Sequence, residues 1–256
     1  SLTTGLKKGY FGKNNNNNID IEVIIYYPAH LNVDIDNEFG SSFFEDIDGS
    51  VDLDLSYGNF EARNLTSTEL NLDVEFGQIN VKRFQAGKVE VAYGGFTADA
   101  AGALKLDSEF SNNEVELVDQ LELETAYDKN YFGNITTAFI NSEFSGLRLD
   151  RLEKHLELTV AYGSFTLKSI ASTFEKIHVN SEFTGVDLYF DSPMNFAFKA
   201  SVDMGSIDYT KDLAKITLIE KEMMEMKLEG YFGNAKGQSP KLILEVENAS
   251  ANINIK

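Results

Sequence analysis

Acidic side chains at a fixed place in a repeated pattern are the residues of this chain whose spacing best suits a chemical role. Three positions before a recurring aromatic residue, a carboxylate occupies six successive units, at Asp36, Asp54, Asp73, Glu90, Asp107 and Glu124. Units stacked as strands about 4.8 Å apart would align these carboxylates in one outward column. Carboxylate oxygens suit Ca²⁺, so the column is a candidate calcium site. A solvated acidic face that keeps strand edges from aggregating is the favoured interpretation, because no EF-hand loop or glycine-aspartate nonapeptide is present.

The usual catalytic residue types form no recognisable arrangement. The three histidines, His30, His155 and His178, have no spacing typical of a zinc site or a nucleophile triad. Ser108, Ser142 and Ser181 lie two positions before an aromatic, and we expect them to face inward, with hydroxyls bonded to the backbone. The sequence therefore assigns no catalytic or cofactor-binding residue.

The small number of arginines gives little support to a polysaccharide-cleaving active site. A polysaccharide lyase needs exposed acids and a base that takes a proton and stabilises charge. There are four arginines, Arg63, Arg83, Arg148 and Arg151, and no tryptophan. Arg148 and Arg151 flank Asp150, which a surface ion pair explains equally well. Aromatics that could reach a ligand would come from loops, with Tyr131, Phe132 and Tyr189 as candidates.

Composition limits the class of partner. The 256 residues include 43% hydrophobic residues, enough for a core, and 41 acidic against 22 basic residues give a formal charge of −19. Nucleic acids and anionic membranes need a positive surface, so both are unfavourable partners. There is no cysteine, which excludes thiol chemistry and disulfides. The longest apolar run, residues 23–27, is far shorter than the roughly 20 residues of a membrane helix, and we expect any secretion signal to lie outside this sequence.

One short unit recurs about every 18 residues and predicts the fold. Its aromatics are Phe39, Tyr57, Phe76, Tyr93, Phe110, Tyr127, Phe144, Tyr162 and Phe183, at steps of 18, 19, 17, 17, 17, 17, 18 and 21 residues. Apolar and polar residues alternate before each aromatic, and Gly, Ser, Asp or Thr usually follows it, so each unit is typical of strand, bend, strand and loop. By this alternation the aromatic itself is expected to point into the core. Glutamate precedes the phenylalanines and Ser or Ala the tyrosines, which would keep like charges two turns apart.

A unit of this size cannot bury its own apolar face and must stack on its neighbours. We therefore predict an all-β, single-stranded, right-handed parallel β-helix, that is, a β-solenoid of roughly 10 to 12 turns. An antiparallel meander is less favoured, because Asp48-Gly49 is the main tight hairpin signal. Residues 1–30 would form an N-terminal segment and cap, with Asn14 to Asn18 as a polar loop and Ile19 to Tyr27 as a first strand or cap.

Residues 31–256 would form the solenoid, regular to about residue 190 and degenerate beyond it. Asp203-Met204-Gly205 and Tyr231-Phe232-Gly233 are interpreted as late units. The methionine-rich and charged insertion between them, around residues 211–227, is either a strand pair or a short helix.

The units "VDIDNEFG", "VDLDLSYGNF", "LNLDVEFGQINV" and "LELTVAYGSFTL" resemble those of a family of adhesin-like β-helical domains from Gram-negative envelope proteins, similar to the head domain of autotransporter adhesins. The resemblance covers residues 31 to 190 best. It implies a right-handed β-helix with a secreted, periplasmic or surface location and an adhesive role. It carries over no catalytic residue.

The leading functional hypothesis is a non-enzymatic envelope protein whose solenoid face binds a glycan or a surface protein, with no cofactor unless the carboxylate column takes Ca²⁺. The alternatives are a carbohydrate-active enzyme of pectinase-like architecture and a structural envelope spacer without a ligand. The ligand, the oligomeric state and any lipid or other anchor are left open by the sequence.

Overall fold

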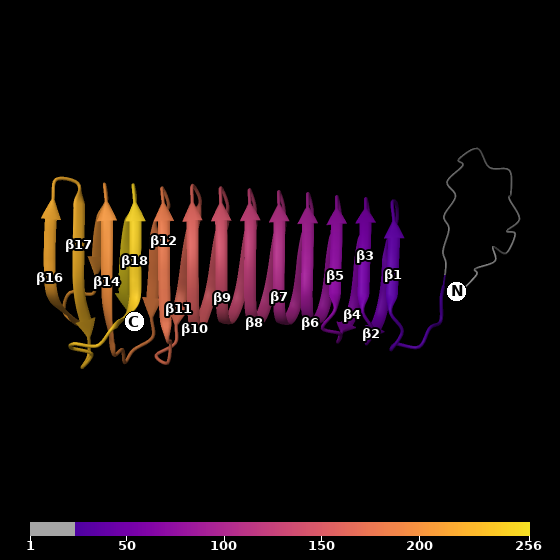
Figure 1. Ribbon diagram of the computed structural model, residues 1–256, viewed down its shortest axis with the longest axis horizontal. Coiled ribbons are helices and arrows are strands. Elements are labelled where there is room, and N and C mark those ends of the chain that lie inside the picture. Colours follow the sequence, from indigo (N-terminus) through magenta and orange to yellow (C-terminus); the bar gives the residue numbers. More distant parts are fainter. Residues whose placement is uncertain (1–23) are drawn as a thin grey trace, which may run out of the picture.

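The computed structural model describes residues 24–256, and these form one long stack of β-strands (Figure 1). The polar run Asn14 to Asn18 and residues 19–23 of the expected first strand lie outside the described part. Residues 24–32 contain no strand, and Tyr27 packs edge-on against Phe44 beside the first turn. No helix in residues 24–256 is long and apolar enough to cross a membrane.

Each turn of the coil has two strand segments, one on each of two faces, and a long strand such as β8 contributes one segment to each of two successive turns. The first nine turns are built from β1 (Val33–Asn37), β2 (Ser42–Ile47), β3 (Val51–Ser56), β4 (Asn59–Leu65), β5 (Leu70–Glu75), β6 (Gln78–Ala92), β7 (Gly95–Glu109), β8 (Asn112–Ala126), β9 (Lys129–Glu143), β10 (Gly146–Ala161), β11 (Ser164–Ile170), β12 (Lys176–Glu182) and β13 (Val186–Phe190). Within residues 24–256 these nine turns follow one another in chain order, and two more are built out of chain order. Neighbouring strands of the nine turns pair in parallel and in register, apart from one-residue shifts where β10 pairs with β9 and β11 with β13. The predicted parallel β-solenoid with a repeat of about 18 residues is confirmed, and its right-handedness stays a prediction.

The strands form two faces on opposite sides of the core. Face A contains the strands that precede each bend: β1, β3, β5, the second halves of β6 to β10, and β12. Face B contains the strands that follow it: β2, β4, the first halves of β6 to β10, β11 and β13. Each of β6 to β10 crosses from face B to face A without a break. Alternating apolar residues of both faces, such as Leu123 and Phe132, fill the space between them.

The aromatics of the bends lie on the outside, and the prediction that they point into the core was wrong. From Tyr57 to Phe183 their exposed fractions run from 42% to 53%. Each has a left-handed backbone, with φ between 51° and 60°. The strand thus ends one residue before the aromatic, and the positive φ turns the aromatic side chain outward although the strand's alternation would place it inside.

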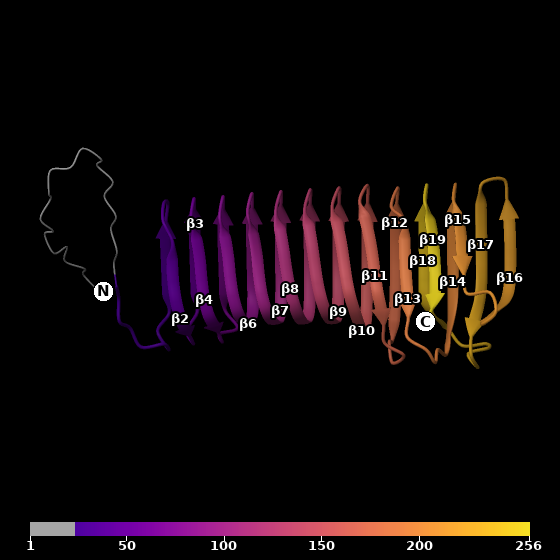
Figure 2. The ribbon, with the colours of Figure 1, turned by 180° about the vertical axis from the view of Figure 1, so that it is seen from behind.

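The chain leaves its simple order after β13. The remaining strands are β14 (Phe196–Asp203), β15 (Ser206–Tyr209), β16 (Ala214–Glu222), β17 (Glu225–Phe232), β18 (Pro240–Glu247) and β19 (Ser250–Ile255). On face A, β18 pairs in parallel with β12 on one side and with β14 on the other, and on face B β19 lies between β13 and β15 in the same way. The last turn in the sequence is therefore inserted between two turns that precede it, as the yellow strands among orange ones show (Figures 1 and 2).

The insertion around residues 211–227 is a strand pair, one of the two predicted forms. β16 and β17 form an antiparallel hairpin, and β17 also pairs antiparallel with β14. Met204 does occupy a bend, with φ 49°. Tyr231-Phe232-Gly233 is not a unit, because Phe232 is buried at the end of an antiparallel strand. The other late bend is at Asn248, with φ 56°, where no aromatic marks it in the sequence.

Candidate functional site

The six carboxylates of the predicted column are brought into one line on face A. Each of them, from Asp36 to Glu124, is the register partner of the next. The pKa of Asp73 is raised mainly by burial and further by the neighbouring charges of Asp54 and Glu75. Within residues 24–256 no three acidic or histidine side chains group in a way that could hold a metal ion. Calcium binding by the column stays a prediction, and the geometry adds no specific cage to it.

Cations interrupt the acidic face only from β6 onward. Lys88 pairs with Glu90, and Lys105 pairs with Glu122 of the next turn. The predicted alternation of glutamates beside the aromatics is confirmed, since Glu75 and Glu109 both have Ala92 as register partner. It fails once, where Glu182 faces Glu247 of the inserted strand β18.

The exposed aromatics form a stacked column along one edge of the coil. From Tyr57 to Phe183, consecutive ring centroids are 4.9 to 5.1 Å apart with interplanar angles of 3° to 15°. Each ring therefore covers the faces of its neighbours, and only ring edges and tyrosine hydroxyls meet solvent. Sugars stack on the faces of aromatic rings, so the column is better suited to stabilising the bends than to binding a glycan.

Face B carries a groove lined by six consecutive turns, from Gln78 of β6 to Ser164 and Thr166 of β11. Its volume is about 840 Å³, and amide, hydroxyl and charged side chains dominate its lining. One wall is the column of register partners Thr97, Glu114, Tyr131, Arg148 and Thr166. The lining also includes Asn112, Lys129, Gly146 and Ser164, the register partners two positions earlier in the same strands. Gly146 leaves room here, because a Cβ at that position would have only Ser164 Oγ at 3.5 Å and Asp128 O at 4.0 Å nearby.

The centre of the groove wall is held by a set of polar contacts. The Arg148 guanidinium lies 5.2 Å from the Tyr131 ring centroid and donates from Nε to Asp150 Oδ1 at 2.9 Å. Asp150 also accepts from the Tyr131 hydroxyl at 3.2 Å and pairs with Lys168 at 3.2 Å. The hydrogen bond from Arg148 holds the pKa of Asp150 below its usual range. Tyr131 and Arg148 are thus fixed in position. The surface ion pair with Asp150, one explanation offered for Arg148 and Arg151, forms at Arg148 only.

Beneath the groove lies a buried polar network around one carboxylate, which two asparagines of the lining join. Asp128 is 3% exposed and accepts hydrogen bonds from the hydroxyls of Ser108 and Thr125 and from the backbone N–H of Ser111. Among the described residues no cation pairs with it. Burial raises the pKa of Asp128, although the three donors favour its ionised form. Asn113 and Asn130, both buried in the groove lining, donate to the same two hydroxyls at 2.9 and 2.8 Å.

The three serines expected inside the coil are indeed buried, but their partners differ. Ser181 Oγ donates to the backbone oxygen of Thr184, as expected, whereas the hydroxyl of Ser108 donates to Asp128. Ser142 Oγ has no hydrogen-bond partner. Hydroxyls at this position thus serve the interior of the coil, and they are not exposed nucleophiles.

The remaining candidates are dispersed. His155 packs against Phe139 with ring centroids 5.4 Å apart, and His178 Nε2 lies 3.6 Å from Glu245 Oε2. Tyr131, Phe132 and Tyr189 lie in strands β9 and β13, so the expectation that they belong to loops was wrong. Phe132 is also fully buried and cannot face a ligand. The Lys256 ammonium lies 4.5 Å from the Tyr189 ring centroid, on face B beyond the groove.

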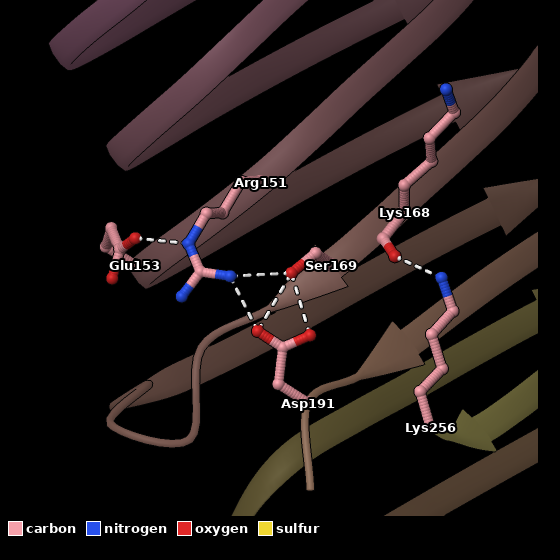
Figure 3. A network of polar contacts seen from close by, with 6 residues as sticks. All are labelled: Arg151, Glu153, Lys168, Ser169, Asp191 and Lys256. Carbon is pink, nitrogen blue, oxygen red and sulfur yellow. Dashed lines mark hydrogen bonds and ion pairs between the residues drawn. The ribbon is translucent and has the colours of Figure 1, made fainter.

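Arg151 takes part in a network at the corner where the regular turns end (Figure 3). Its guanidinium donates to Asp191 Oδ2 at 2.6 Å, to Ser169 Oγ at 2.8 Å and to Glu153 at 2.6 Å. Burial disfavours the charge on Asp191, but hydrogen bonds from Arg151 and Ser169 outweigh it and lower the pKa. Arg151 therefore has a structural role, tying β10 to β11 and to the segment that leaves β13.

Sequence reasoning missed the groove. Its wall residues are spaced by one repeat, at positions 97, 114, 131, 148 and 166, and this regular spacing could have revealed them. The mixture of residue types in that column hid it, because no single chemistry repeats along the wall. No family model, curated protein or solved structure matches this chain, so the resemblance stated above rests on the repeat units alone and only its β-solenoid is confirmed.

Proposed function

We propose that this protein is a non-enzymatic, extracytoplasmic binding protein that holds an extended glycan in the groove of face B. The groove lined by β6 to β11 is the observation that carries the proposal. The five turns from β7 to β11 alone span roughly 19 Å at the strand spacing of a sheet, room for several sugar units. Its amide and hydroxyl groups can exchange hydrogen bonds with sugar hydroxyls, and binding sites combine a few fixed polar groups with aromatic surface.

Tyr131 and Arg148 are the groups expected to contribute most to binding. Tyrosine and arginine are common among residues whose truncation costs more than about 1 kcal/mol at an interface. Here both are held by Asp150, so they lose little conformational freedom when a ligand binds. The resemblance of the repeat units to adhesin-like envelope domains supports the adhesive and extracytoplasmic parts of the proposal.

The proposal is tested by a glycan array followed by calorimetry on the best hits. Gly146→Gln should greatly weaken binding, because its side chain would occupy the space that Gly146 leaves open in the groove, while its backbone has no positive φ to strain. Tyr131→Ala and Arg148→Ala should each weaken binding by about tenfold or more. Asn141→Ala, an exposed residue on face A, is the matched control and should leave affinity unchanged. Equal binding by wild type and Gly146→Gln would contradict the proposal.

A carbohydrate-active enzyme remains the second candidate, since Glu114 lines the same groove beside Tyr131 and two turns from Arg148. Incubation of the array hits with the protein would release shorter products in that case, and Glu114→Gln would stop their release. A protein without any glycan ligand would fit the structural spacer instead.

A further inference from the structure

The inserted turn β18–β19 makes its strand contacts with parts of the chain that are distant in sequence. β18 pairs with β12 and β14, and β19 pairs with β13 and β15. Its side-chain contacts follow the same rule: Asn252 donates to Asp187 at 2.7 Å, and the backbone N–H of Ile255 donates to Thr210 at 3.0 Å. Lys256 reaches the backbone oxygen of Lys168 (Figure 3).

The turn contributes fully to the core of the coil. Leu242, Leu244, Val246, Ala251 and Ile253 are 0% to 1% exposed. Without this turn, β12 and β14 would each present an unpaired edge toward the other across a gap one strand wide. Unpaired edges flanking apolar surface bind any strand of fitting sequence. The gap between the β12–β13 turn and the β14–β15 turn is therefore a slot that fits residues 240–256.

A short loop is the only connection that ties the inserted turn to the chain whose slot it occupies. Residues 233–239 join β17 to β18 with most of their side chains exposed, and Gly233 and Gly237 have positive φ. A Cβ on Gly237 would meet nothing within 4 Å. Hydrogen bonds link this loop to the rest of the chain: the backbone N–H of Asn234 donates to the side chain of Asn195 at 2.9 Å, and Lys215 donates to the backbone oxygen of Gly233 at 3.4 Å. Seven residues extend to roughly 24 Å, enough to carry β18 into a neighbouring molecule.

We propose that the slot also accepts residues 240–256 of a second copy of this chain, so that the protein forms strand-exchanged oligomers. The exchanged turn makes the same pairings and buries the same side chains as the turn of its own chain. The two arrangements differ only in the loop and in the entropy of association, which is the situation that favours domain swapping. The inference is independent of the groove and of the proposed function.

The test uses the absence of native cysteine in the full chain. His178 and Ile243 are register partners in β12 and β18, with Cα atoms spaced as a disulfide allows. His178→Cys and Ile243→Cys chains are unfolded together, refolded at high concentration and oxidised. Strand exchange predicts at least tenfold more covalent dimer than for Ile243→Cys with Asn141→Cys, whose strand β9 pairs with β8 and β10 and not with β18.

The double variant His178→Cys/Ile243→Cys, which should close the bond within one chain, checks that the geometry permits it. A second measurement needs no disulfide: a labelled peptide of residues 240–256, refolded in excess with the full chain, should co-elute with it. The same peptide with Leu244→Asp should not, because it would bury a charge. The proposal is overturned if the His178→Cys and Ile243→Cys chains form no more covalent dimer than the control pair and the full chain does not take up the unmodified peptide.

Discussion

The nine regular turns and the region after residue 190 use the same stacking physics, but they differ in how far apart in sequence the stacked strands lie. In the regular turns, partners are about one repeat apart, as in Asp54 and Asp73. In the later region β19 stacks on β13, and Asn252 bonds to Asp187, 65 residues away. Closing longer loops costs more chain entropy. The regular turns can therefore add one at a time along the chain, whereas the inserted turn and the β14–β15 turn beyond it have to form together.

Deletion of residues 240–256 should have the largest effect and should be confined to one region. It removes the strands between β12 and β14, so β14 to β17 lose their strand pairing with the coil and keep only ring contacts such as Phe196 with Phe190. We expect residues 196–232 to exchange their amide hydrogens without protection, while β5 to β10 stay protected. Loss of protection throughout the coil would mean that the two regions are one cooperative unit.

Leu244→Ala and Leu123→Ala compare equivalent core positions of the two regions. Both leucines are 1% exposed, so each truncation should cost about 2–5 kcal/mol. The two variants should differ in which strands exchange their amide hydrogens faster, because Leu244→Ala loosens only β18 and the strands beside it. Hydrogen exchange should then rise in β12, β14 and β18 for Leu244→Ala and around β7 to β9 for Leu123→Ala. Identical exchange patterns in the two variants would remove the distinction.

Asp128 gives the regular turns a pH dependence of their own. Burial raises its pKa in the folded protein, so the folded state binds the proton more tightly than the unfolded state. This contribution to stability is greatest below the ordinary pKa of 3.8 and is lost as pH rises through the higher folded pKa. The variant Asp128→Ser places at this bend the residue type that Ser111 and Ser145 have at the equivalent bends, and it should lack this pH-dependent contribution.

Denaturant unfolding of both proteins from pH 3 to pH 7 measures this difference. The variant should gain stability relative to wild type as pH rises, by about 1.4 kcal/mol for every pH unit that separates the folded and unfolded pKa values of Asp128. A difference in stability that does not change with pH would show that Asp128 has the same pKa in both states.

The smallest difference is expected between two variants at one bend of the aromatic column. Tyr127 stacks on Phe110 and Phe144 and has φ 60°. Tyr127→Ala loses two stacking contacts of about 0.5–1.5 kcal/mol each and keeps the strained backbone. Tyr127→Gly loses the same contacts but relieves a strain of about 1 kcal/mol, so it should be the more stable of the two. Chemical denaturation of both variants tests this, and an alanine variant as stable as the glycine variant would show that the bend is unstrained.

The sequence determined the parts of this protein that depend on neighbouring repeats. A period of about 18 residues, with apolar residues such as Leu70, Leu72 and Val74 in alternation, requires stacked turns because a single unit cannot bury them. The same period aligned the carboxylates from Asp36 to Glu124. Alternation follows from extended backbone alone, so it predicts side-chain direction only as far as the strand continues.

Only the tertiary structure decided where that rule stops. The left-handed backbone at Tyr93 and its equivalents turns the rings outward, because it lets them stack across turns while their N–H groups still bond to the next turn, as from Tyr93 to Glu109. The groove arises from different residue types aligned by register around Gly146. The insertion of β18–β19 depends on pairing with β12 to β15, which lie far away in the sequence, so the period of the repeat does not predict it.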